Sequence, residues 1–113
     1  PVVYGDGMQT RDFIHVRDVA RLNRLALNLD VGFGVYNVGS GRGMSILELA
    51  KLVLRMAGIS EEPVFGPPRP GDIRHSVADI SRVRRDLGFG PTISLEEGLR
   101  ELLREVGSHP PEE

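Results

Sequence analysis

Two capping boxes constrain the fold of this chain more than any other feature, because each marks the start of an amphipathic helix. Ser45 is followed three residues later by Glu48, and Ser94 is followed in the same way by Glu97. Apolar residues recur at helical spacing behind both boxes and in a third stretch that begins near Asp18. The sequence therefore predicts three amphipathic helices within one globular domain.

Short apolar runs bounded by glycine and proline predict strands before and between these helices. Asp6-Gly7 predicts a two-residue type I′ hairpin turn between the first two strands, since that turn needs positive φ at both central positions. Strands are expected at 1–4, 10–16, 35–38 and 63–65. The alternation of strands and helices predicts an α/β fold.

Turn residues predict where the helices end. Gly32 and Gly34 are expected to end the first helix, and Gly58 is expected to follow the last turn of the second. A fourth, short helix is expected between Asp79 as its cap and Gly88 as its stop.

Composition excludes several classes of protein. The 113 residues suffice for one domain with its own core, and the absence of cysteine fits a reducing cytoplasm, where we expect the protein. The net charge of −2 offers no bulk attraction to nucleic acid or to a membrane, and no apolar run reaches the ~18 residues of a membrane span. Pro1 opens the chain inside an apolar run, which favours a fragment or a truncated reading frame.

No complete cofactor or catalytic motif is visible in the sequence. The loop at 39–43 lies between an expected strand and a helix, but the third glycine of a dinucleotide fingerprint would fall on Met44. His15, His75 and His109 lack metal-ligand spacing. We therefore expect no catalytic, cofactor-binding or metal-binding residue in this chain.

Two lone arginines beside turn residues are the candidates for a ligand site. Arg11 stands next to Asp12, and Arg69 stands three residues before Asp72 in a stretch rich in proline and glycine. Two guanidinium groups on structured loops can clamp a diphosphate, and an aspartate can accept hydrogen bonds from a ribose diol. The same residues can instead form a surface ion pair and a salt bridge within a turn, so the spacing leaves both readings open.

Four segments occur in order and at consistent spacing. They are Val3-Tyr4-Gly5-Asp6-Gly7-x-Gln9-Thr10-Arg11-Asp12-Phe13-Ile14-His15-Val16-x-Asp18, then Tyr36-Asn37-Val38-Gly39-Ser40-Gly41, then Arg69-Pro70-Gly71-Asp72-x-Arg74-x-Ser76-x-Ala78-Asp79, and last Leu87-Gly88-Phe89 with Ser94-Leu95-Glu96-Glu97-Gly98-Leu99. They closely resemble the C-terminal part of the NAD-dependent nucleotide-sugar epimerases and dehydratases, which are extended short-chain dehydrogenase/reductases. UDP-glucose and UDP-N-acetylglucosamine 4-epimerases look nearest.

The resemblance implies that the chain is the C-terminal fragment of a Rossmann-type enzyme, without its dinucleotide-binding half. Residues 1–107 would form the substrate-binding portion, of which 18–38 would pack on the missing Rossmann sheet, and 108–113 would be a polar tail. In the complete enzyme, NAD would support epimerisation of a UDP-hexose by transient oxidation at C4 of the sugar. The hexose must turn while the nucleotide stays fixed, so binding energy must come from the nucleoside diphosphate.

The substrate contacts of the family carry over to matching positions of this sequence. Arg11 and Arg69 would hold the diphosphate, and Asp72 would accept the ribose hydroxyls. The backbone of the first strand would lie along the uracil edge, and the glutamine would add a weaker contact. Ser76 would face the C2 side of the sugar, where a small residue leaves room for an N-acetyl group. The implied substrate-binding residues are Val3, Tyr4, Gln9, Arg11, Arg69, Asp72 and Ser76.

The chain departs from the family in lacking the glycine fingerprint, the acidic ribose binder and the Tyr-x-x-x-Lys dyad. Neither Tyr4 nor Tyr36 has lysine four residues later, and Lys51 is the only lysine. We expect the chain alone to be inactive, not to bind NAD, and to self-associate or to pair with the missing Rossmann domain or another subunit. The alternatives are a non-catalytic nucleotide-sugar-binding or interaction module, and a 4,6-dehydratase or decarboxylase of the same family. UDP and dTDP also remain alternatives, because the base contacts are largely backbone.

Overall fold

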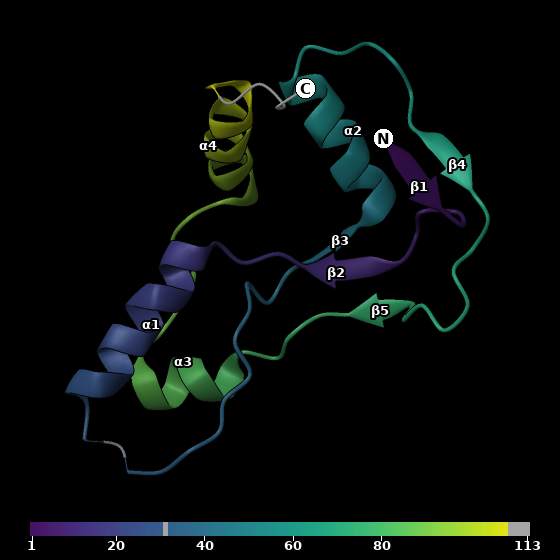
Figure 1. Ribbon diagram of the computed structural model, residues 1–113. Coiled ribbons are helices and arrows are strands. Elements are labelled where there is room, and N and C mark those ends of the chain that lie inside the picture. The colour runs from purple at the N-terminus through teal and green to yellow at the C-terminus, as the bar shows by residue number, and fades with distance from the viewer. Residues whose placement is uncertain (31, 109–113) are drawn as a thin grey trace.

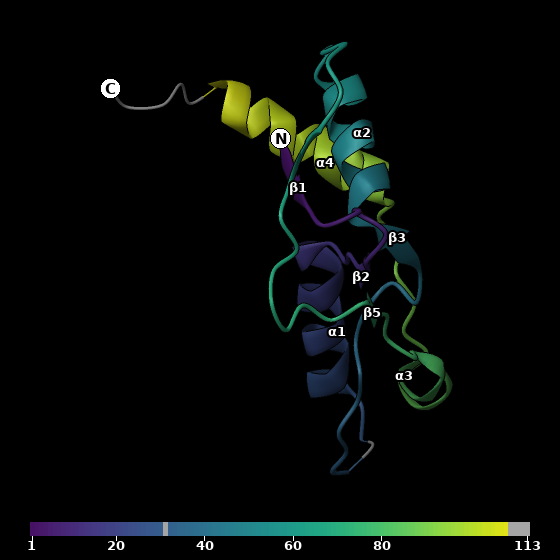
Figure 2. The same ribbon diagram turned by 90° about the vertical axis from the view of Figure 1, so that its right-hand side faces the viewer.

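A computed structural model of the chain describes residues 1–30 and 32–108. Short strands and helices alternate along these residues, so the expected α/β fold class is confirmed (Figure 1). In chain order the elements are β1 Val2–Tyr4, β2 Thr10–Asp12, α1 Val16–Asn28, β3 Gly43–Ser45, α2 Ile46–Met56, β4 Val64–Gly66, β5 His75–Ser76, α3 Ser81–Leu87 and α4 Leu95–Ser108. Helices α1 and α3 lie at one end of the molecule and α2 and α4 at the other, with β2 and β5 between them (Figures 1 and 2).

The strands form two small sheets. β1 and β4 pair in parallel, while β2 lies between antiparallel β3 and parallel β5. The hairpin expected between the first two strands is therefore wrong. Gly5 and Gly7 have positive φ but Asp6 does not, so a type I′ turn cannot form. Instead, the Asp6 carboxylate accepts the Met8 N–H at 2.9 Å, and the turn carries the chain from one sheet to the other.

The other strand predictions are partly wrong. The strand expected at 10–16 ends at Asp12, because His15 caps α1 by accepting the Arg17 N–H on Nδ1 at 3.0 Å. Residues 35–38 form no strand, since no strand of the described residues lies beside them to complete a ladder. The strand expected at 63–65 is confirmed as β4, whereas β3 and β5 were not expected, because two or three residues are too few to show alternation.

The capping signals place the helix boundaries well. Both capping boxes form, with the serine hydroxyls accepting the N–H groups of Glu48 and Glu97 at 3.1 Å. Gly58 follows the end of α2 and Gly88 ends α3, with φ of 71° and 66°. These left-handed values favour glycine and explain why both helices stop there.

Three helix ends differ from expectation. Helix α1 ends at Asn28 with Leu29 as its C-cap, so Gly32 and Gly34 do not end it. Asp79 accepts the Ser81 N–H at 2.9 Å, but the cap position of α3 belongs to Ile80, whose apolar side chain is buried. Helix α4 continues through Ser108, the first residue of the tail expected at 108–113. Residues 109–113, which include His109, lie outside the described residues.

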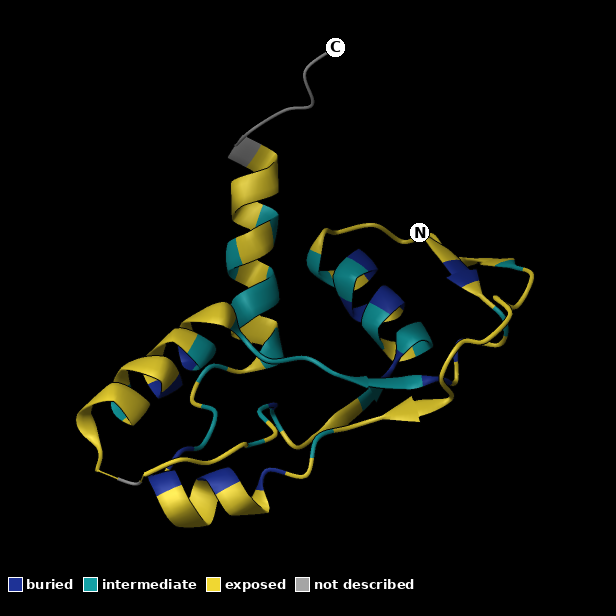
Figure 3. Cartoon of the chain, turned by 60° about the horizontal axis from the view of Figure 1, so that its bottom comes forward, coloured by how far each residue is buried: buried dark blue, intermediate teal, exposed yellow. Residues whose placement is uncertain are grey.

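The core lies between α1 and α3 (Figure 3). Leu22 of α1 packs with Val83 and Leu87 of α3, and Phe89 is fully buried beside them. Full burial of such a side chain contributes ~1.5–3 kcal/mol. A second group of buried residues on α2 and β1 holds the two sheets together, and it comprises Val3, Ala50, Leu52 and Leu54.

The molecule is less compact than a typical domain of 113 residues. Its radius of gyration is 16.9 Å, whereas a compact domain of this length has ~13 Å. Large apolar side chains are exposed where α1 ends, and Leu27, Phe33 and Val35 are 87%, 97% and 70% exposed. Among residues 1–30 and 32–108, none of the helices combines the length and the apolar character needed to traverse a bilayer.

Candidate functional site

A cleft of about 530 Å³ opens where the end of β1 meets the segment between β4 and β5. Four residues expected from the sequence line it, and they are Tyr4, Gln9, Arg69 and Asp72. The other lining residues are Gly5, Asp6, Gly66, Pro68, Ile73 and Arg74. Two segments far apart in the sequence therefore converge on one cavity.

Hydrogen bonds connect polar side chains from the two segments that form the cleft. The side chain of Gln9 is nearly buried, and its Nε2 donates to the Tyr4 carbonyl at 3.1 Å and to Asp72 at 3.5 Å. Arg11 lies outside the lining, but its Nη2 is 2.6 Å from Asp72 Oδ1. Arg11 thus forms its ion pair with Asp72 and not with its sequence neighbour Asp12. Its link to the cleft is this contact, because Asp72 is a lining residue.

Arg69 stands against the ring of Tyr4. Its guanidinium carbon is 4.2 Å from the ring centroid, a cation–π contact worth ~0.5–1 kcal/mol at an exposed site. The Asp72 N–H donates to the Arg69 carbonyl at 3.3 Å, so the two residues do share a turn. Their side chains form no salt bridge within the described residues, and the alternative of an ion pair across this turn is therefore wrong.

A second ion pair in the cleft was missed from the sequence. Arg74 donates from both terminal nitrogens to the Asp6 carboxylate, at 2.8 and 2.9 Å. These hydrogen bonds and the Met8 N–H lower the pKa of Asp6 to about 2. The only sequence signal was the presence of opposite charges in the two candidate segments, and spacing alone does not reveal such a pairing.

Asp12 was also missed, although its carboxylate organises the glycine loop. It accepts the Ser40 N–H at 2.7 Å, the Ser40 hydroxyl at 2.6 Å, the Gly41 N–H at 3.0 Å and the Ala78 N–H at 3.2 Å. Burial raises the pKa of Asp12, but these hydrogen bonds outweigh it and hold the pKa below its usual value. Because the N–H groups of Ser40 and Gly41 donate to Asp12, these two are not free to bind a phosphate. Gly39 is the signal that could have found this contact, since a Cβ there would lie 2.5 Å from the carboxylate.

Besides Arg11, two further expected site residues do not line the cleft. Val3 is 1% exposed and belongs to the core, so only the backbone of β1 can reach a ligand at that position. Ser76 is exposed on β5, directly opposite Arg11 in the parallel pairing with β2. The structure therefore brings together Tyr4, Gln9, Arg69 and Asp72. Arg11 contacts this group through Asp72, and Ser76 lies opposite Arg11 on the neighbouring strand.

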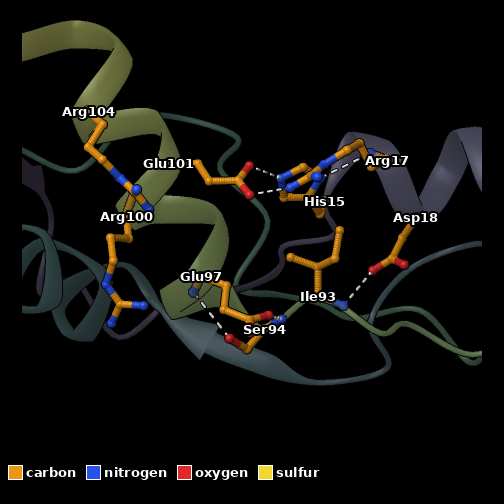
Figure 4. A network of polar contacts seen from close by, with 9 residues as sticks. All are labelled: His15, Arg17, Asp18, Ile93, Ser94, Glu97, Arg100, Glu101 and Arg104. Carbon is orange, nitrogen blue, oxygen red and sulfur yellow. Dashed lines mark hydrogen bonds and ion pairs between the residues drawn. The ribbon is translucent and has the colours of Figure 1, made fainter. Parts of the chain in front are cut away.

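Helix α4 is fastened to the start of α1 by a histidine (Figure 4). His15 Nε2 lies 3.2 Å from one Glu101 oxygen, and Arg17 contacts the other oxygen of the same carboxylate. The side chain of His15 is 14% exposed and lies against Gly98. His75 contacts the Thr10 hydroxyl through Nδ1 at 2.9 Å. The His15 contacts lie away from the cleft, whereas Thr10 and His75 each follow a residue that lines it, Gln9 and Arg74.

Asp18 fastens α1 to the segment that precedes α4. Its carboxylate is buried and accepts the Ile93 N–H at 3.0 Å (Figure 4). It also accepts the Thr92 N–H at 3.1 Å and the Thr92 hydroxyl at 2.9 Å. Arg21 adds a contact at 3.3 Å. Burial raises the pKa of Asp18, but these hydrogen bonds outweigh that effect, and the pKa lies below its ordinary value.

A second hollow, of about 340 Å³, lies between α4 and residues 13–16. Its lining is largely apolar and includes none of the expected substrate-binding residues. Within the described residues, no group of three His, Asp or Glu side chains is placed to hold a metal ion. The polar cleft is therefore the stronger candidate for a ligand site.

Comparison with known proteins gives matches over nearly the whole chain. The family model described as GDP-mannose 4,6 dehydratase matches residues 1–102. The UDP-glucose 4-epimerase of Mycolicibacterium smegmatis is 39% identical over 97 residues, which cover 86% of this chain and 31% of that protein. The crystal structure of Thermotoga maritima UDP-glucose 4-epimerase with UDP-glucose is 40% identical, with a TM-score of 0.82, and the match covers 93% of this chain and 35% of that one. The UDP-N-acetylglucosamine 4-epimerase of Methanobrevibacter ruminantium, solved with UDP-N-acetylmuramic acid, is 39% identical, with a TM-score of 0.88, over 96% of this chain and 34% of that one.

The fold is that of one part of a Rossmann-type short-chain dehydrogenase/reductase. Within that class, the chain belongs to the nucleotide-sugar epimerase and dehydratase family, whose model carries the name GDP-mannose 4,6 dehydratase. The family resemblance of the four sequence segments is thereby confirmed. The chain spans about a third of the length of the curated relatives it matches.

Proposed function

We propose that the chain forms the nucleoside-diphosphate side of the substrate site of an NAD-dependent UDP-hexose 4-epimerase. The observation that carries this proposal is the convergence of Tyr4, Gln9, Arg69 and Asp72 on one cleft, with Arg11 paired to Asp72 behind it. The relatives named above, which include an epimerase with bound UDP-glucose, support the choice of ligand. A 4,6-dehydratase or decarboxylase would use the same cleft for its nucleotide.

Each cleft residue has a chemical role in this proposal. Arg69 and Arg11 bind the diphosphate through charge-assisted hydrogen bonds. Asp72 contacts Gln9 only at 3.5 Å through Oδ2, so this oxygen can accept a ribose hydroxyl. In this proposal, the uracil edge lies along the backbone of Val3 and Tyr4 in β1. These contacts hold the part of the substrate that does not react, which leaves the hexose free to turn.

The oxidation chemistry belongs to the rest of the complete enzyme in this proposal. When bound there, NAD supplies transient oxidation at C4 of the sugar. The glycine loop of this chain does not fit NAD, since it lacks the third glycine of a dinucleotide fingerprint and the N–H groups of Ser40 and Gly41 already donate to Asp12. The residues of this chain do not fit a tyrosine base either, because the hydrogen bond to Asp86 raises the pKa of Tyr36, and Lys51 lies beside Glu62 at 4.0 Å. We therefore infer that the chain alone is inactive.

The partner in this proposal is the Rossmann part of the complete enzyme or a subunit that supplies it. The apolar side chains exposed after α1, including Phe33, need such a surface to become buried. When neither the Rossmann part nor such a subunit is present, we propose that copies of this chain associate with one another through these exposed apolar side chains. A cytoplasmic location is part of the same proposal and rests on the lack of cysteine.

The proposed function is tested by calorimetric titration of the chain with UDP, UDP-N-acetylglucosamine and NAD. We expect both UDP compounds to bind, NAD to give no response, and the Arg11→Ala/Arg69→Ala double variant to lose the UDP response. An Arg24→Ala/Arg104→Ala variant is the matched control, because it removes two exposed charges outside the cleft. Loss of binding in both variants, or no binding by the wild-type chain, would overturn the proposal.

A further inference from the structure

One ion pair joins the two loops that form the walls of the cleft. Asp6 lies in the turn between β1 and β2, and Arg74 lies just before β5. The two carboxylate oxygens accept from the two terminal guanidinium nitrogens at 2.8 and 2.9 Å, a bidentate geometry that fixes orientation as well as distance. Both side chains line the cleft, and each is 56% exposed.

Backbone contacts hold the same two loops only at their ends. The Gly5 N–H donates to the Gly66 carbonyl at 3.1 Å, and the Thr10 N–H donates to the Arg74 carbonyl at 2.9 Å. The Gln9–Asp72 hydrogen bond, at 3.5 Å, also crosses between these points, and the Asp6–Arg74 pair is the ion pair that joins one loop to the other there. One loop is flanked by Tyr4 and Gln9, and the other carries Arg69 and Asp72, so the pair sets how far apart the two walls stand.

We propose that the Asp6–Arg74 ion pair fixes the two walls of the nucleotide cleft, and that Arg74 is a positioning residue and not a phosphate ligand. This inference rests on the proposed function, since it assigns a role in binding the same nucleoside diphosphate. To bind phosphate directly, Arg74 would have to give up two charge-assisted hydrogen bonds to Asp6. The lowered pKa of Asp6 keeps its carboxylate ionised at neutral pH, so the pair persists where the ligand binds.

The two roles of Arg74 predict opposite effects of removing Asp6. A carboxylate in a cleft for an anionic ligand repels that ligand, so its neutralisation should strengthen binding if Arg74 is a phosphate ligand held back by Asp6. If the ion pair positions the walls, the same change should weaken binding. The sign of the Asp6→Asn effect therefore separates the two roles.

The test is calorimetric titration of UDP and UMP into the 113-residue chain and its variants. We expect Asp6→Asn and Arg74→Met each to weaken UDP binding about three- to fivefold, the range of an exposed ion pair, and to weaken UMP by the same factor. The reversed pair, Asp6→Arg/Arg74→Asp, should return to within about twofold of the wild type, because it restores the ion pair without an arginine at position 74. Arg85→Met breaks the pair with Asp86, which is also exposed, outside the cleft, and should leave binding unchanged.

Several results would overturn the inference. Unchanged or tighter UDP binding by Asp6→Asn would contradict it, as would a loss in Arg74→Met that is larger for UDP than for UMP. A reversed pair that binds as weakly as Arg74→Met would assign the arginine to the phosphate. If the wild-type chain binds no UDP, the proposed function fails as well, which is distinguishable from a wild type that binds and variants that do not differ from it.

Discussion

Tyr4 decides where the guanidinium of Arg69 lies before any ligand arrives. The sequence marks Arg69 as a ligand candidate, but it does not indicate that the aromatic ring at the end of β1 would hold that arginine at 4.2 Å. Stacking on a ring restricts the rotamers of a long side chain, so less conformational entropy remains to be lost when it binds an anion. The ring thus prepares the cleft for its ligand.

Replacement of Tyr4 by leucine should therefore weaken UDP binding by about two- to fivefold, since a cation–π contact at an exposed site contributes ~0.5–1 kcal/mol. Tyr4→Phe retains the ring and should bind UDP like the wild type. Calorimetric titration of both variants measures the difference. Equal losses in the two variants would show that the hydroxyl, and not the stacking, matters.

A substitution at Ser76 tests whether this residue lies beside the sugar in the proposed site. It is exposed on β5 opposite Arg11, and we propose that its small side chain leaves room for an N-acetyl group. Ser76→Tyr should weaken binding of UDP-N-acetylglucosamine by about tenfold and change UDP-glucose little, because the added ring fills the space of the acetyl group. Ser60→Tyr, at an exposed position outside the cleft, is the control. An equal loss for both sugars would contradict the assignment of Ser76.

At the scale of elements, Asp18 joins α1 to the segment before α4. Asp18→Asn should lower the free energy of unfolding by about 1–3 kcal/mol at pH 7, because the amide cannot accept all of the N–H and hydroxyl donors that face the buried carboxylate. Urea denaturation measures the loss. Asp30→Asn, at an exposed position, should leave the free energy of unfolding unchanged.

The same carboxylate gives a pH dependence of known sign. The folded-state pKa of Asp18 is lowered, so its contribution is fully present above the ordinary aspartate pKa and is lost as the pH falls through the folded value. The difference in unfolding free energy between the wild type and Asp18→Asn should therefore shrink below about pH 4. A difference that stays constant down to pH 2 would contradict this account.

The sequence predicted helices better than strands, for a physical reason. Helix ends depend on local contacts, such as the hydroxyl of Ser45 with the Glu48 N–H, and these can be read from spacing. Strands of two or three residues depend on partners far away in the chain. Asp6-Gly7 predicted a local hairpin, whereas the preceding strand pairs with residues 64–66. Local turn chemistry did not reveal that long-range pairing.

For the candidate site as well, the residues could be predicted from the sequence, but the contacts between distant positions could not. Arg11, Arg69 and Asp72 could be selected as residues, since their types and the family resemblance pointed to an anionic ligand. The contacts among them could not be derived, because the Arg11–Asp72 and Asp6–Arg74 pairs join positions more than sixty residues apart. Only the folded chain shows that one aspartate contacts both Gln9 and Arg11.

At the scale of the whole molecule, the open shape leaves apolar surface without a partner. The radius of gyration of 16.9 Å shows that the molecule is extended. The exposed side chains of Leu27 and Phe33 show that the region where α1 ends has apolar surface with nothing packed against it among the described residues. We expect light scattering to show self-association that grows with concentration, and we expect Leu27→Ser/Phe33→Ser to reduce it, since less apolar area would remain to be buried. Met8→Ser, which removes an exposed apolar side chain elsewhere, should not reduce it. A wild-type monomer at high concentration would contradict the expectation.

The location of nucleotide binding is the central claim, and nuclear magnetic resonance tests it most directly. Gln9 is the single glutamine of the sequence, so its side-chain amide gives a signal that belongs to one wall of the cleft. On titration with UDP, we predict shifts of this amide and of the Arg69 Nε–H, and none of the Gln9 amide in the Arg11→Ala/Arg69→Ala variant. Shifts confined to the apolar hollow beside α4, or none at all, would contradict the account.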